Sequence, residues 1–104
     1  MTATGFLAVS PKVNGSMAPE IAKAVDALEE FDVEYETTPM GTILETRSAG
    51  ELFSAAQAAH EAVDTERVGT FLKIDDKRTV DQPAEQKVER VEEQLGRPAR
   101  RNSE

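Results

Sequence analysis

The sequence predicts an α+β fold, because four strand-like runs and two amphipathic helical segments alternate along its 104 residues in the order βαββαβ. The strand-like runs are short and rich in β-branched and aromatic residues, whereas the helical segments repeat apolar residues three and four positions apart. An additional helical segment follows the last strand. This order is that of the ferredoxin-like arrangement, in which a four-stranded antiparallel sheet carries two helices on one face.

The first strand and the first helix are expected near the start of the chain. Residues 4–10 are a short apolar run that Pro11 ends, which suits a buried strand. After a loop over residues 11–16, Ser16 can cap a helix that has Pro19 in its first turn, where a missing N–H has no cost. Apolar residues then recur on one side of this helix and are expected to cover the sheet. They are Ile21, Ala24, Val25, Leu28 and Phe31.

A tight hairpin is expected in the middle of the sequence. Its two strand-like runs, residues 33–37 and 40–45, are so close that the chain must reverse within about two residues. Pro39 cannot donate a ladder hydrogen bond and belongs at the reversal or on an edge. Gly41 can approach another backbone or a ligand closely, or host a bulge. Polar and apolar residues interleave here, so one face can join the core while the other offers hydroxyls and a carboxylate.

A second helix and a fourth strand follow the hairpin. Ser48 and Glu51 have the spacing of a capping box, which marks the start of the helix. Residues 68–75 form the next strand-like run, and a charge cluster that includes Asp75 and Asp76 ends it. Such paired acids can hold a metal ion or a ligand amine, and they can equally form a solvated turn with local ion pairs.

The chain is expected to form a single domain over residues 1–96. A third helix carries Val88, Val91 and Leu95 at helical spacing and stops at Gly96, a typical cap residue. The polar segment 97–104 has no apolar anchor and is predicted to be a disordered tail. Two helices cover only one face of a sheet, so the third helix, a second subunit or water must cover the other face. We expect self-association to a dimer or tetramer, sheet to sheet or edge to edge.

Composition restricts the possible partners. The chain has 20 acidic and 12 basic residues, and its net charge of -8 argues against nucleic acid or an anionic membrane as a partner and favours a cationic small ligand. The absence of cysteine excludes disulfides and thiolate chemistry, and a single histidine excludes a histidine metal cluster, so we expect no metal and no cofactor. No leader and no run of about 18 apolar residues is visible, which predicts a cytoplasmic protein.

Four segments together resemble the small thiamine-binding protein family of the YkoF-like superfamily. They are the Pro-Met-Gly-Thr hairpin within residues 35–45, residues 60–63, the Lys-Ile-Asp-Asp run at 73–76 and residues 87–93. The resemblance extends from about Leu7 to Leu95. It implies a ferredoxin-like fold, assembly into dimers and often tetramers, and binding of thiamine or its pyrimidine moiety without an established reaction.

Residue chemistry is compatible with such a ligand. Threonine hydroxyls can bind the edge of an aminopyrimidine, a methionine can pack on a ring, and carboxylates can balance the cationic thiazolium. Two more polar residues lie on the loop expected at the same end of the sheet. The predicted ligand-binding residues are Ser10, Asn14, Thr37, Thr38, Met40, Thr42, Glu45, Asp75 and Asp76.

Two other functions stay open beside a non-catalytic binding protein. One is an oligomeric or regulatory protein that binds no vitamin. The other is a small enzyme that acts on thiamine fragments through Glu45, His60 or the pair Asp75 and Asp76. No nucleophile and base stand at a recognisable spacing, so no catalytic residue is assigned. A His60 that faces a pocket beside carboxylates would favour the enzyme.

Overall fold

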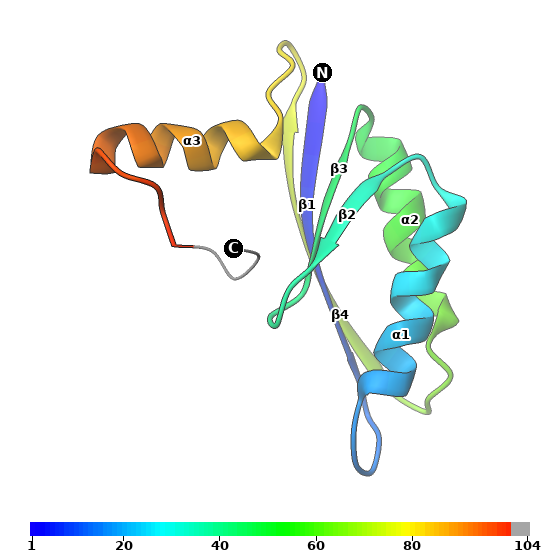
Figure 1. Cartoon of the computed structure of the whole chain (residues 1–104). Helices are drawn as coiled ribbons and strands as arrows, with labels where there is room; N and C mark the ends of the chain where they lie inside the picture. Colours follow the sequence, from blue (N-terminus) through cyan, green and yellow to red (C-terminus); the bar gives the residue numbers. More distant parts are fainter. Residues whose placement is uncertain (101–104) are drawn as a thin grey trace.

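The computed structural model describes residues 1–100, which form one four-stranded sheet and three α-helices (Figure 1). The strands lie in the order β2-β3-β1-β4, and all neighbours are antiparallel. This is the predicted ferredoxin-like α+β fold with an additional C-terminal helix. The elements are β1 (Thr2–Pro11), α1 (Ala18–Ala27), the 3-10 turn η1 (Leu28–Glu30), β2 (Glu34–Thr37), β3 (Thr42–Thr46), α2 (Ala49–Ala62), β4 (Val68–Lys77) and α3 (Ala84–Leu95).

The core lies between the sheet and the two helices α1 and α2, which cover the same face of the sheet (Figure 1). Leu28, Leu44 and Leu52 are the largest fully buried side chains. Small residues let α2 lie close to the sheet: a Cβ on Gly5 of β1 would come within 2.9 Å of the Leu52 side chain. The core is therefore built from leucine and alanine rather than from aromatic residues.

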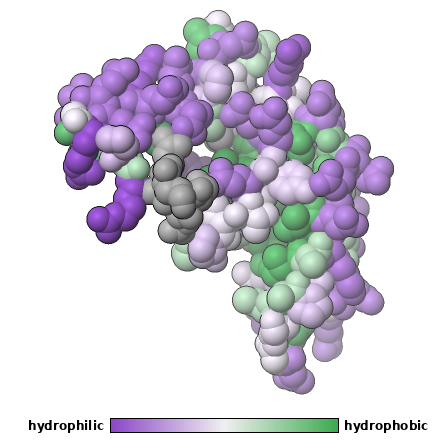
Figure 2. Space-filling view, in the orientation of Figure 1, coloured by the Kyte–Doolittle hydropathy of each residue, from purple (hydrophilic) through white to green (hydrophobic). Residues whose placement is uncertain are grey.

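The opposite face of the sheet, which we call the open face, carries Phe6, Ile43 and Phe71. Residues on a strand alternate between faces, so Phe6 and Ile43 point away from the helices that bury Leu7 and Leu44. The rings of Phe6 and Phe71 form an edge-to-face pair with 6.4 Å between centroids. In Figure 2, α3 is mostly hydrophilic, whereas hydrophobic residues gather in the middle and lower part of the view.

Helix α3 leaves the end of the sheet and projects away on the side of the open face (Figure 1). None of its residues is buried, and Val91 and Leu95 are exposed. It ends at Gly96, the predicted cap residue, which adopts a left-handed conformation with φ 72°. In the segment predicted as a tail, the Ala99 N–H donates to Glu92 Oε2 at 2.7 Å, and residues 101–104 lie outside the described residues.

The first and last strands of the chain, β1 and β4, are longer than the sequence suggested. β1 and β4 pair without interruption from Thr2 opposite Lys77 to Pro11 opposite Val68. Backbone hydrogen bonds with β1 continue to the end of β4, so β4 ends at Lys77 and not at residue 75. Asp75 and Asp76 consequently lie on opposite faces of a strand and do not share a turn.

The two helix starts differ from the predicted caps in detail. The N-cap of α1 is Met17, and the Ser16 hydroxyl accepts from the Ala18 N–H at 3.1 Å. Ser48 caps α2 as predicted and accepts from the Glu51 N–H at 3.4 Å. The capping box is only half formed, because the Glu51 carboxylate accepts from the Asp32 N–H at 3.0 Å instead. Each helix within residues 1–100 is too short or too polar to span a bilayer.

Candidate functional site

A cavity of about 240 Å³, which we call the hairpin pocket, lies between α1, the end of β1 and the β2–β3 hairpin. Strand β1 contributes residues 7–10 and the hairpin contributes residues 37–42. The third wall consists of apolar side chains of α1, its N-cap and η1. These are Met17, Ile21, Ala24, Val25 and Leu28.

Among residues 1–100, no charged residue lines the hairpin pocket. Its polar residues are Ser10, Thr37, Thr38 and Thr42, each of which carries a hydroxyl group. A cavity with apolar walls and a few hydroxyls suits an uncharged ring with donors and acceptors on its edge. It offers no carboxylate to neutralise a bound cation.

The hairpin turn determines which of these hydroxyls are available. The Thr38 N–H donates to the Gly41 carbonyl at 2.8 Å, and the Gly41 N–H donates back at 3.3 Å, so the chain reverses through Pro39 and Met40 as predicted. The Thr38 hydroxyl also donates to the Gly41 carbonyl and accepts from the N–H groups of Met40 and Gly41. One donor and two acceptor positions are all that a hydroxyl has. Thr38 therefore shapes the turn and has no hydrogen bond left for a ligand.

Gly41 brings the hairpin close to β1. A Cβ at this position would lie 2.6 Å from Phe6 Cζ and 2.8 Å from the Leu7 carbonyl oxygen. The close approach that the sequence suggested for Gly41 is thus made to the neighbouring strand. This contact sets the distance between the hairpin and β1, which both line the pocket.

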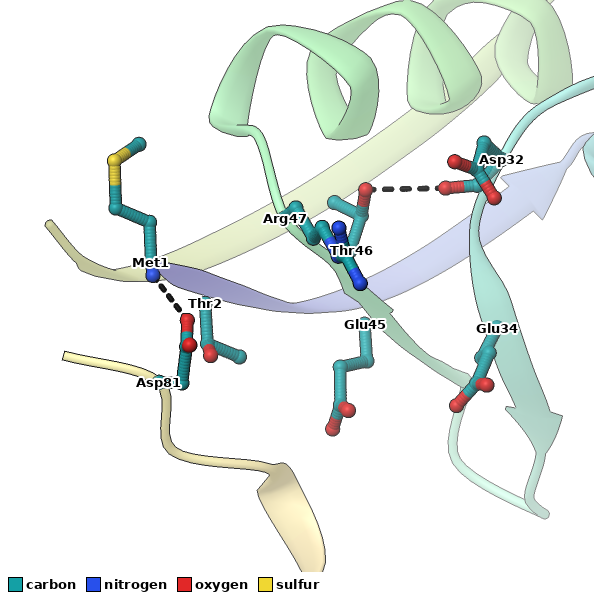
Figure 3. A pocket seen from close by; sticks show the side chains of 8 residues that line it. All are labelled: Met1, Thr2, Asp32, Glu34, Glu45, Thr46, Arg47 and Asp81. Carbon is teal, nitrogen blue, oxygen red and sulfur yellow. Dashed lines mark hydrogen bonds and ion pairs between the residues drawn. The ribbon is translucent and has the colours of Figure 1, made fainter.

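A second, more open cavity of about 1020 Å³ lies at the other end of β3, beside the start of β1 (Figure 3). Four carboxylates line it together with Arg47 and the amino group of Met1. Those of Glu34 and Glu45 stand opposite each other on β2 and β3. The complete lining is Met1, Thr2, Asp32, Glu34, Glu45, Thr46, Arg47 and Asp81.

Two of the three predicted carboxylates, those of Glu45 and Asp75, attach α3 to the sheet, and none of the three lines the hairpin pocket. Glu45 Oε1 accepts from the N–H of Ala84, the first residue of α3, at 2.6 Å. Asp75 forms an ion pair with Lys87, and the hydrogen bond from this ammonium group lowers the pKa of Asp75. Asp76 pairs with Arg78 Nε at 3.1 Å.

The nine predicted ligand-binding residues therefore separate into three groups. Ser10, Thr37, Thr38, Met40 and Thr42 line the hairpin pocket. Glu45 lines the second cavity, and Asn14, Asp75 and Asp76 line neither of the two. The hairpin segment thus meets the end of β1 as expected, whereas the acidic residues lie elsewhere.

Sequence reasoning missed the α1 wall of the pocket. The helical spacing of Ile21 and Val25 predicts that they cover the sheet, and Met17 lies outside this pattern. A core residue and a pocket residue on the same helix have the same apolar chemistry, so no signal in the sequence separates them.

His60 lies in the last turn of α2, where its ring Nδ1 shares a hydrogen bond with the Thr70 hydroxyl of β4. It lines neither cavity, so the arrangement that would favour an enzyme is not seen there. Among residues 1–100, no group of three or more histidine, aspartate or glutamate side chains is placed to hold a metal ion.

Comparison with known proteins identifies the family. The sequence model of the family described as "Thiamine-binding protein" matches residues 6–92. A UPF0045 protein of Methanothermobacter thermautotrophicus is 46% identical over 83 residues, which are 77% of this chain and 84% of that protein.

Two solved structures have the same fold. Protein MJ1052 of Methanocaldococcus jannaschii matches with a TM-score of 0.80 and 29% identity over 88% of this chain and 97% of its own. A candidate thiamine biosynthesis or salvage protein of Thermotoga maritima matches with a TM-score of 0.75 and 21% identity over 88% and 99% of the two chains. The match of the family model over residues 6–92 and the 46% identical relative show that the chain belongs to the thiamine-binding protein family.

Proposed function

We propose that this protein binds thiamine through its pyrimidine moiety, in the hairpin pocket, and catalyses no reaction on it. The observation that carries the proposal is an uncharged pocket with hydroxyl groups in a member of the thiamine-binding protein family. With the Thr38 hydroxyl used in the turn, Thr37 and Thr42, which lie on the same face of the sheet as Leu7, are the side chains proposed to bind the ring edge.

The size of the pocket supports a single ring. Sites for small molecules usually measure about 300–1000 Å³, so the 240 Å³ of the hairpin pocket is small for the whole of thiamine. The pyrimidine would be enclosed, and the thiazolium would stay in solvent beside the exposed Met17 and Met40. The net charge of -8 still favours the approach of a cation over longer distances.

Isothermal titration calorimetry with hydroxymethylpyrimidine, thiamine and a choline control tests the proposal. We expect saturable binding of the first two ligands and none of choline. Thr42→Val replaces a pocket hydroxyl with a methyl group of similar size and should weaken binding about threefold to tenfold. Thr46→Val is the matched control, because Thr46 lies on the same strand, outside the pocket, and donates to the Asp32 carbonyl.

Absence of binding by either pyrimidine compound at millimolar concentration would refute the proposal. Equal affinity of wild type and Thr42→Val would instead remove this hydroxyl from the site. If neither pyrimidine compound binds, the oligomeric or regulatory function is the better account of the fold.

We also propose that a second copy of the chain covers the open face. Phe71 is 59% exposed there, beside Phe6, although large apolar side chains are normally covered. Neither α1 nor α2 reaches this face, and α3 projects away from it (Figure 1). Pairing of the open faces would bury these rings and would be compatible with a dimer or tetramer.

A further inference from the structure

The first turn of α1 forms part of the hairpin pocket but is not held in place by burial. Met17 and Ile21 line the pocket, and Met17 is 47% exposed. Within Ala18–Ala27 the buried residue is Ala24, more than a turn beyond the start of the helix. The position of the first turn therefore depends on polar contacts.

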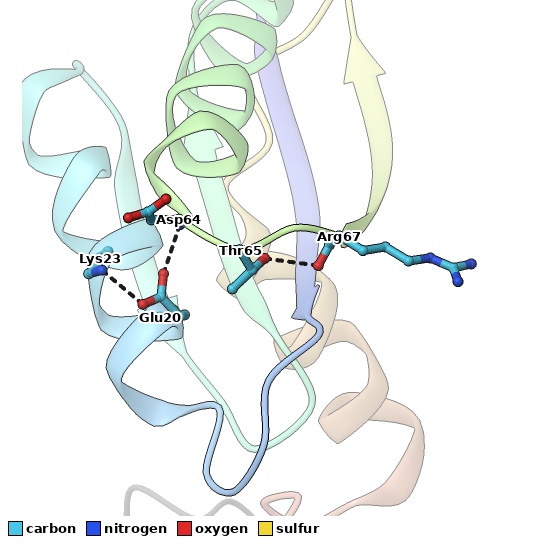
Figure 4. Close-up of polar contacts among 5 residues, drawn as sticks. All are labelled: Glu20, Lys23, Asp64, Thr65 and Arg67. Carbon is cyan, nitrogen blue, oxygen red and sulfur yellow. Dashed lines mark hydrogen bonds and ion pairs between the residues drawn. The ribbon is translucent and has the colours of Figure 1, made fainter.

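Glu20 makes the contact that joins this turn to the rest of the molecule (Figure 4). Its Oε1 accepts from the Asp64 N–H at 2.8 Å, across 44 positions of sequence, and its Oε2 accepts from Lys23 Nζ at 2.8 Å. The Glu20 side chain is only 15% exposed. Both carboxylate oxygens are thus engaged, one of them with a distant part of the chain.

The partner of Glu20 is itself firmly placed. Asp64 follows Val63, which is buried in the core at the end of α2. Within the same loop the Thr65 hydroxyl donates to the Arg67 carbonyl at 2.8 Å, and this carbonyl also accepts from the Lys12 N–H at 2.9 Å. The loop therefore joins the end of β1, which lines the pocket, to the start of α1.

We propose that Glu20 is a positioning residue for the hairpin pocket, and that its hydrogen bond with the Asp64 N–H holds Met17 and Ile21 in the pocket wall. Without this bond the first turn opens more often, because little apolar surface holds it. A ligand must then order the turn as it binds, which lowers its affinity. The effect on affinity rests on the proposed function, whereas the effect on the order of the helix does not.

Three variants of the full chain test this role. Glu20→Ala removes both contacts, whereas Glu20→Gln keeps a carbonyl oxygen that can accept from the Asp64 N–H. Ser48→Ala removes the cap of α2 without touching the pocket or α1 and controls for a general loss of stability. Amide hydrogen exchange at Ile21, whose N–H donates to the Met17 carbonyl, reports the order of the first turn. Calorimetry with hydroxymethylpyrimidine reports the affinity.

In Glu20→Ala we expect exchange at Ile21 to be about tenfold faster and the dissociation constant to be about tenfold higher. Glu20→Gln should stay close to wild type in both measurements. Ser48→Ala should lower the melting temperature and leave both measurements unchanged. Unchanged exchange at Ile21 in Glu20→Ala, or equal losses in Glu20→Ala and Glu20→Gln, would overturn the proposal. If wild type binds neither pyrimidine compound, the proposed function fails, and exchange at Ile21 still decides the role of Glu20.

Discussion

At the scale of single residues, Thr38 and Gly41 give the hairpin its shape. Among residues 1–100 the only residues with positive φ are Gly15 and Gly96, so the two-residue turn at Pro39 and Met40 is not one of the types that hairpins favour. The Thr38 hydroxyl compensates by binding three backbone groups of the turn. Gly41 lets this turn lie against β1, where any side chain would collide.

Replacing Gly41 by alanine should destabilise the fold. The added Cβ would lie 2.8 Å from the Leu7 carbonyl oxygen, a backbone atom that cannot rotate away. We expect the free energy of unfolding to fall by about 1–3 kcal/mol, as for other overpacked sites, in urea denaturation. Gly50→Ala is the control, because a Cβ there would meet only the Ser48 hydroxyl, at 3.4 Å, and should leave stability equal or slightly higher. Equal stability of both variants would contradict the close approach at Gly41.

At the scale of elements, α3 is attached to the sheet mainly by polar contacts. The Glu45 carboxylate binds its first N–H, Asp75 pairs with Lys87 in its second turn, and the Thr2 hydroxyl accepts from the Gln82 N–H at 2.9 Å just before it. A carboxylate at the positive end of a helix is favourable. Glu45 and Asp75, two of the predicted ligand-binding carboxylates, thus attach this helix, whereas Asp76 pairs with Arg78 outside it.

The attachment of α3 should weaken in acid. Lys87 lowers the pKa of Asp75, so the ion pair contributes stability above the ordinary aspartate pKa of about 3.9 and loses it as pH falls through the lower pKa of folded Asp75. In an NMR titration of the Asp75 carboxyl group, Lys87→Met should move the midpoint to higher pH. Arg90→Met, on the same helix, leaves the pair in place and should not change the midpoint. A midpoint that is the same in wild type and Lys87→Met would contradict this account.

At the scale of the whole molecule, the two faces of the sheet differ in how they are covered. α1 and α2 bury the face that carries Leu7 and Leu44, whereas the open face presents aromatic rings to solvent. The hairpin pocket lies on the helix-covered side, beside α1, so self-association through the open face would leave the pocket accessible.

Sedimentation velocity can test the proposed association. Phe71→Asp places a charge on the open face and should shift the protein from dimers or tetramers toward monomers, because burial of a charge is costly. Phe53→Asp is a matched control, since Phe53 on α2 is also 59% exposed but lies outside the open face. A wild-type protein that is monomeric at all concentrations, or the same shift in both variants, would count against the open face as the interface.

The sequence by itself determined the order and type of the elements. Helical spacing of apolar residues, the Ser48 cap, the stop at Gly96 and the reversal at Pro39 all depend on residues a few positions apart. Such local patterns predict secondary structure, because each strand and helix must bury its apolar side. The hairpin residues could be placed at one end of the sheet for the same reason.

Only the tertiary structure decided which polar groups meet. Glu45 reaches Ala84 across 39 positions and Glu20 reaches Asp64 across 44, and no spacing in the sequence indicates either contact. The tertiary structure also separated pocket residues such as Ile21 from core residues on the same helix. These outcomes depend on how the elements pack, because charge and hydrophobicity specify what a side chain can bind but not which distant partner comes within reach.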